Sequence, residues 1–121
     1  MFTFYDNQIT SSEPFEYVPV TADETYELGE ALKMSGGKAT KCGATDKPVY
    51  ICMGKGEGSR VPVVPVLATR RYEVPYTAKP TVGTKVTLHT DGLQVTATTA
   101  SGVFEIVSVY ETAGTVTGYF R

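Results

Sequence analysis

The chain has 121 residues, of which 41% are apolar and 20% charged, and its formal net charge is −2. This length and composition fit one globular domain with its own core and differ from those of disordered chains. The small negative charge argues against a protein that binds duplex nucleic acid, because such binding depends on a basic face that neutralises phosphates. We therefore expect no specific nucleic-acid partner.

The first residues show no basic start followed by an apolar stretch, so no signal peptide is evident. No apolar run approaches the roughly 20 residues of a membrane-spanning helix. We therefore expect a protein that stays in the cytoplasm of the cell that makes it and has no membrane partner. Cys42 and Cys52 lack the CxxC spacing of redox and zinc sites, which favours two free thiols. A disulfide between paired strands is the alternative.

Residues 1 to 20 concentrate aromatic side chains in a segment that Pro14 and Pro19 interrupt. Such a segment is too short for a core of its own, yet too aromatic for a solvated tail. One interpretation is an extended N-terminal arm that packs on another subunit or another protein, where buried aromatic rings supply much of the binding energy. The other is an edge strand folded back on its own domain. The candidate interface residues in this segment are Phe2, Phe4, Tyr5, Phe15 and Tyr17.

Residues 21 to 121 are predicted to form a body of short β-strands. Residues 31–34 and 38–41 flank Ser35-Gly36-Gly37, a sequence typical of a hairpin turn. Residues 48–53 form a compact apolar strand. In the next one, Pro62 and Pro65 remove two hydrogen-bond donors, which favours a sheet edge or an irregular crossing. Residues 72–76 continue the extended pattern.

The last third of the chain carries further hairpin signals. Asp91-Gly92 separates two stretches with an apolar residue at every second position, which predicts a two-residue type I′ turn. Residues 103–110 and 115–120 are predicted as two final strands, the last of which pairs inside a sheet. The best helix candidate, residues 22–26, is barely one turn long. The chain is therefore predicted to be mainly all-β, as a single compact antiparallel barrel or sandwich.

The sequence offers no catalytic constellation. The glycine-rich loop at residues 54–59 lacks the spacing of a phosphate-binding loop and is followed by a proline-broken strand rather than a helix. His89 is the one histidine, without a pattern of metal ligands around it. The Asp and Glu residues are spread over loops and strand ends rather than paired. We expect no enzyme activity, no metal and no cofactor.

Arg70, Arg71 and Tyr72 form a second candidate interface between two proline-marked segments. Arginine and tyrosine are enriched at interfaces because arginine makes bidentate contacts and tyrosine buries a large area at low entropic cost. A solvated turn is the alternative.

Strand-like segments between residues 26 and 121 together form a recognisable pattern. They are Tyr26–Leu32, Pro48–Ile51, Val61–Val63, Gly83–Leu88, Asp91–Val95, Gly102–Val107 and Gly118–Arg121. In these segments the chain resembles the small decoration (head-stabilising, or cement) proteins of tailed bacteriophages and of prophages of Gram-positive bacteria. The aromatic arm is not matched.

The resemblance implies a fold and a function. It implies a β-barrel or β-tulip-like body and a non-enzymatic structural protein on the exterior of the virion capsid, made in the host cytoplasm. The implied partner is the major capsid protein, whose subunit contacts it stabilises, and the implied state is a homotrimer. The alternatives are another virion component, such as a tail or baseplate β-domain, and a carbohydrate- or single-stranded-DNA-binding barrel that stacks ligands on Tyr50, Tyr72 and Tyr76.

Overall fold

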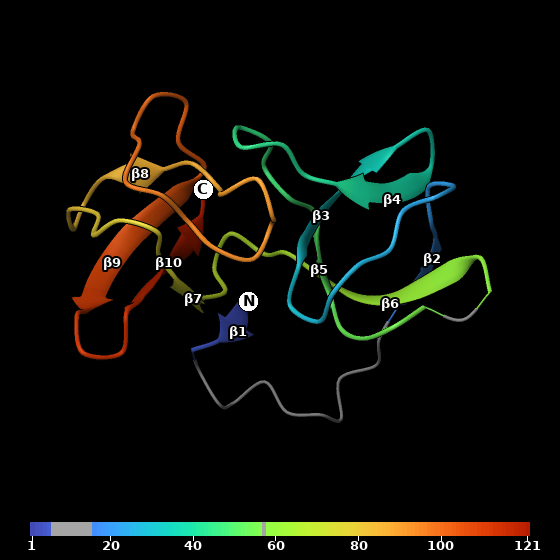
Figure 1. Ribbon diagram of the computed structural model, residues 1–121, viewed down its shortest axis with the longest axis horizontal. Helices are drawn as coiled ribbons and strands as arrows, with labels where there is room; N and C mark the ends of the chain where they lie inside the picture. The colour runs from blue at the N-terminus through green and yellow to red at the C-terminus, as the bar shows by residue number, and fades with distance from the viewer. Residues whose placement is uncertain (6–15, 57) are drawn as a thin grey trace.

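The structure is a computed structural model that describes residues 1–5, 16–56 and 58–121. In these residues it is all-β, with two antiparallel five-stranded sheets and no helix. Sheet A has the strand order β1-β7-β10-β9-β8, and sheet B has the order β2-β6-β5-β3-β4. Figure 1 shows sheet A at the left and sheet B at the right. The strands are β1 (Thr3–Phe4), β2 (Glu16–Pro19), β3 (Ala31–Ser35), β4 (Lys38–Lys41), β5 (Tyr50–Cys52), β6 (Arg60–Pro65), β7 (Tyr72–Pro75), β8 (Lys85–Val86), β9 (Phe104–Tyr110) and β10 (Thr115–Phe120).

The all-β prediction is confirmed, but the pairings among the described residues do not close either sheet into a barrel. Sheet B comes closest to closure, because a parallel bridge between Val20 and Ala39 brings its two edges together at one point. The helix candidate at residues 22–26, for which a loop was the alternative, forms a turn and loop in which Asp23 has a φ of 66°. No helix in the described part of the chain is long and apolar enough to cross a membrane.

Two predicted hairpins are confirmed. β3 and β4 are joined at Gly36 and Gly37, whose φ angles of 59° and 78° lie where glycine is favoured. β9 and β10 pair along most of their length, and β10 lies between β7 and β9, so the last strand does pair inside a sheet. A register shift in this pair falls between Thr117 and Gly118. A side chain at Gly118 would place its Cβ 2.0 Å from the carbonyl oxygen of Glu105.

Of the two alternatives for the proline-containing strand, a sheet edge or an irregular crossing, the sheet edge is wrong, because β6 lies between β2 and β5. The backbone N–H of Met53 donates to the carbonyl oxygen of Pro62. Pro62 therefore faces the residue that follows the end of β5 at Cys52. Pro65 lies opposite Tyr50 of β5. Pro62 thus lies where the pairing with β5 ends, and little pairing is lost there.

The hairpin at Asp91-Gly92 exists, but its turn is not type I′. The N–H of His89 donates to the carbonyl oxygen of Gln94 at 2.9 Å, so residues 90–93 connect the two arms. Gly92 has a φ of 70°, whereas Asp91 does not have a positive φ. The Asp91 carboxylate instead accepts from the N–H of Leu93 at 2.8 Å, which is an Asx turn.

The core is built around an aromatic cluster of Phe2, Tyr72, Phe104 and Phe120, with ring centroids as close as 4.9 Å. Residues from sheet B, including Ala31, belong to the same core, so the two sheets share it. A smaller core lies within sheet B and consists of Val18, Leu32, Ala39, Cys52, Val61 and Val63. Cys42 and Cys52 are both free and buried, as the favoured interpretation of their spacing predicted.

The described part of residues 1 to 20 forms strands on its own chain. β1 is an edge strand of sheet A that pairs with β7, and β2 is an edge strand of sheet B that pairs with β6. Phe2 is 3% exposed in the aromatic cluster. These residues therefore follow the interpretation of edge strands folded back on the domain. Phe15 lies outside the described residues.

Candidate binding surface

The outer face of sheet A brings together an arginine, two tyrosines and two hydroxyl side chains. Because side chains alternate along a strand, Tyr72 and Val74 of β7 point into the core while Arg71 and Glu73 point away from it. Tyr5 directly follows β1, which flanks β7 on one side. β10 flanks β7 on the other side, and β10 and its neighbour β9 contribute the hydroxyl groups and the second tyrosine. We call this surface the Arg71 face and define it by Tyr5, Arg71, Ser108, Tyr110 and Thr117.

Hydrogen bonds and stacking hold the guanidinium of Arg71 in place. Its Nε and Nη2 donate to Thr117 Oγ1 at 3.1 and 2.7 Å, and Nη2 also lies 3.3 Å from Ser108 Oγ. The ring of Tyr5 lies on the guanidinium, with 4.2 Å between the ring centroid and Cζ. Thr117 is fully buried beneath this arrangement. Contacts on two sides thus fix the orientation of Arg71.

The two tyrosines of the Arg71 face are joined to each other. Their hydroxyl oxygens lie 3.3 Å apart, and both side chains are about 40% exposed, at 40% for Tyr5 and 39% for Tyr110. The hydrogen bond with Tyr110 raises the pKa of Tyr5, whereas a hydrogen bond with Ser108 and then the one with Tyr5 lower the pKa of Tyr110. Both rings are exposed enough to contact a partner.

A second arginine–tyrosine pair on sheet A provides a comparison. Arg121 stacks on Tyr119 at the same 4.2 Å. Its Nε, however, donates to a carboxylate of its own chain, Glu105, at 3.0 Å. Among the described residues, no carboxylate forms an ion pair with Arg71. The nearby Glu73 accepts a hydrogen bond from Thr115 at 2.7 Å instead.

The structure separates the interface residues that the sequence singled out. Tyr5 and Arg71 lie together on the Arg71 face. Tyr72 is fully buried and Arg70 is 8% exposed, with its guanidinium carbon 4.8 Å from the ring centre of Phe4. Phe2, Arg70 and Tyr72 thus contact other residues of their own chain, and Phe4 is half-buried beside the core. Tyr17, 55% exposed on β2, belongs to the other sheet.

Sequence reasoning missed Ser108, Tyr110 and Thr117. In the register of β9 with β10, Ser108 lies opposite Thr117, and Tyr110 opposite Thr115. The polar residues at alternate positions of these strands indicated a solvent-facing side. Their meeting with Arg71 depends on β10 pairing with β7, which the sequence does not specify locally.

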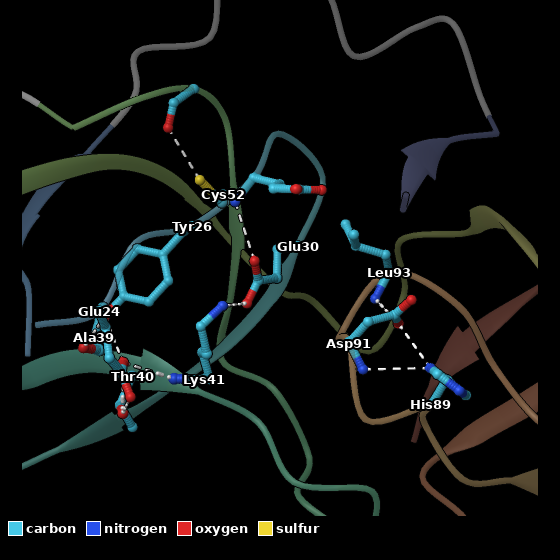
Figure 2. A network of polar contacts seen from close by, with 12 residues as sticks. Glu24, Tyr26, Glu30, Ala39, Thr40, Lys41, Cys52, His89, Asp91 and Leu93 are labelled. Atoms are coloured by element: carbon cyan, nitrogen blue, oxygen red, sulfur yellow. Dashed lines mark hydrogen bonds and ion pairs between the residues drawn. The ribbon is translucent and has the colours of Figure 1, made fainter.

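A polar network in sheet B uses its charged groups structurally (Figure 2). The Glu30 side chain is 3% exposed, and its carboxylate accepts from Lys41 at 3.0 Å and from the Glu27 N–H at 3.0 Å. Burial raises the pKa of Glu24, but hydrogen bonds from Tyr26, Thr40 and the Lys41 N–H outweigh it and hold the pKa below its usual value. Every carboxylate in this network therefore has protein partners.

Burial, followed by the hydrogen bond to Glu24, raises the pKa of Tyr26 to about 12. His89 pairs with Asp91 at 3.3 Å, apart from the Glu24 and Glu30 network in Figure 2. No group of three or more His, Cys, Asp or Glu side chains within the described ranges could hold a metal ion.

Comparisons of this chain with protein-family models, curated proteins and solved structures found no match.

Proposed function

We propose that this chain is a non-enzymatic structural protein that binds the outer surface of a phage capsid and stabilises contacts between major capsid protein subunits. It acts as a homotrimer on the exterior of the virion after synthesis in the host cytoplasm. The resemblance of residues 26 to 121 to phage decoration proteins supports the identity of the partner. The Arg71 face is the observation that carries a binding role, because it presents fixed, half-exposed arginine and tyrosine side chains.

The sheet edges support binding through side chains rather than through an added strand. β1 and β8 are two residues long. On β2, Pro19 has no N–H, and the carbonyl oxygen of Tyr17 accepts from Arg60 at 3.1 Å. β4 begins and ends with a lysine. Short strands, proline and lysine at an edge all disfavour pairing with a further strand, which leaves the faces of the sheets as contact surfaces.

We also propose that the body is related to the compact barrel or tulip of decoration proteins. The bridge between Val20 and Ala39, which brings the two edges of sheet B together, supports this relation. The homotrimer rests on the resemblance alone. Many identical weak contacts over a shell stabilise it together, and a trimer increases the effective concentration of each binding site.

Co-sedimentation with purified heads of the encoding phage or prophage tests the function. The heads are prepared in expanded and unexpanded forms and titrated with the protein. Decoration predicts saturable binding in hundreds of copies per head, with a preference for expanded heads. A few copies per virion, confined to tails, would instead support a tail or baseplate component. Binding to neither shell would rule out decoration.

A further inference from the structure

We propose that Arg71 anchors this protein to its partner by binding a carboxylate of an Asp or Glu side chain on the major capsid protein. The inference rests on the proposed function, from which it takes the partner. The proposal names Arg71 as the residue that makes the contact and an acidic side chain as its acceptor.

Arg71 is already oriented, and the described residues do not accept from all of its donors. A guanidinium has five N–H donors. Nε and Nη2 donate to the hydroxyls of Thr117 and Ser108, while Nη1 donates to no described residue. The two N–H groups of Nη1 thus have no acceptor among the described residues, and a carboxylate can accept a charge-assisted hydrogen bond from them. Because Tyr5 and Thr117 already fix the side chain, little conformational entropy is lost on binding.

Arg121, next to the same sheet, provides a comparison because its charge is paired with a carboxylate of its own chain. Both arginines stack on a tyrosine at 4.2 Å, but Arg121 donates to Glu105, whereas the acceptors of Arg71 are neutral hydroxyls. The charge of Arg71 therefore lacks a carboxylate in contact among the described residues. An acidic side chain from outside would supply it.

The surroundings favour a single protein carboxylate over a nucleic acid. Glu73 and Glu105 lie on the same side of sheet A as Arg71, at positions that alternate with buried residues. A phosphate backbone would meet these negative charges, and the chain carries a net charge of −2. Tyr5 and Tyr110, by contrast, offer contact area of the kind that surrounds an arginine in protein interfaces.

The test measures binding of the full chain to expanded heads for the wild type and for R71Q, R71K and R121Q. Thermal melts of each variant confirm that it is folded. R71Q should weaken head binding roughly tenfold to a hundredfold, as expected for a hydrogen-bonded charge pair. R71K keeps the charge but loses the planar fork, so its loss should be smaller. R121Q should stay within about twofold, because Arg121 already has its own carboxylate.

The R71K variant also allows the contact to be captured directly. A carbodiimide joins a lysine amine to a carboxylate that touches it, so the lysine introduced by R71K should cross-link to an Asp or Glu of the major capsid protein. A cross-link at this position with weakened binding by R71Q supports the proposal.

Equal binding by wild type and R71Q, without a cross-link, would overturn it and leave the decoration function intact. A loss of head binding by R71Q that is no larger than the loss by R121Q would also overturn the inference. Failure of the wild-type protein to bind heads would overturn the decoration function, and this inference with it. Loss of binding on addition of competing single-stranded DNA, at constant salt, would show a nucleic-acid site and contradict the protein carboxylate.

Discussion

The rings of Phe2 and Phe120 pack with their centroids 5.1 Å apart, so the edge strand β1 and the central strand β10 contribute to one core. Both side chains are almost fully buried, at 3% and 0% exposure. The first residues of the chain are therefore part of the fold of sheet A. A truncation that removes them changes stability as well as any contact that they make, and point substitutions separate the two effects.

Replacing Phe2 with alanine should lower the free energy of unfolding by about 3–5 kcal/mol, because it opens a cavity among three aromatic rings. Tyr17→Ala is the matched control: Tyr17 is aromatic and on an edge strand but 55% exposed, so the change should stay within about 0.5 kcal/mol. Urea unfolding followed by circular dichroism measures both. Equal losses for the two variants would contradict the placement of Phe2 in the core.

Gly118→Ala should destabilise the protein by about 3 kcal/mol or more, because the new methyl group would meet the carbonyl oxygen of Glu105 at 2.0 Å. That oxygen belongs to the backbone of β9, which cannot move aside without breaking the pairing with β10. Gly54→Ala is the control, since its Cβ would find ordinary contact at 3.6 Å from Pro62. Thermal melts compare the two, and a Gly118 variant as stable as the Gly54 variant would refute the close approach of Gly118 to the β9 backbone.

The ion pair between Lys33 and Asp46 predicts a pH dependence of stability. The hydrogen bond from Lys33 at 2.7 Å, followed by that from the Gly43 N–H, holds the pKa of Asp46 below its usual value of about 4. A lowered pKa in the folded state means that the stabilisation is present above the unfolded value and disappears as the pH falls through the folded one.

Asp46→Asn should therefore be less stable than the wild type near pH 7 and similar to it near pH 2. The difference should be small, since both side chains are about one-third exposed, at 37% and 35%. Urea titrations at several pH values provide the measurement. A difference that stays constant from pH 7 to pH 2 would show that Asp46 does not act through its charge.

The two cysteines should be unreactive in the folded protein. Burial raises the pKa of Cys42 to about 12 and also raises the pKa of Cys52, so thiolate is scarce near neutral pH and access is blocked. A chromogenic disulfide reagent should label both thiols slowly in buffer and rapidly in concentrated urea. Fast labelling in buffer would contradict the burial of Cys42 and Cys52. Absence of labelling in urea without reductant would reveal a disulfide.

The sequence predicted features that depend on neighbouring residues, such as turns. It did not predict contacts that depend on which distant strands pair. Gly36-Gly37 specified its hairpin because the turn needs two positive φ angles in adjacent positions. Pro62 was misleading because its cost depends on where β5 ends. Arg71 was marked as an interface residue from composition. Its contact with Thr117, 46 positions away, arises from the pairing of β7 with β10.

Hydroxyl-radical footprinting of the protein, free and bound to expanded heads, tests whether the Arg71 face contacts the capsid. The radicals modify exposed aromatic side chains, and mass spectrometry reports the rate at each residue. Tyr5 and Tyr110 should be modified when the protein is free and protected when it is bound to heads, since both flank Arg71. Equal modification rates of Tyr5 and Tyr110 on free and bound protein would contradict a contact between the Arg71 face and the capsid.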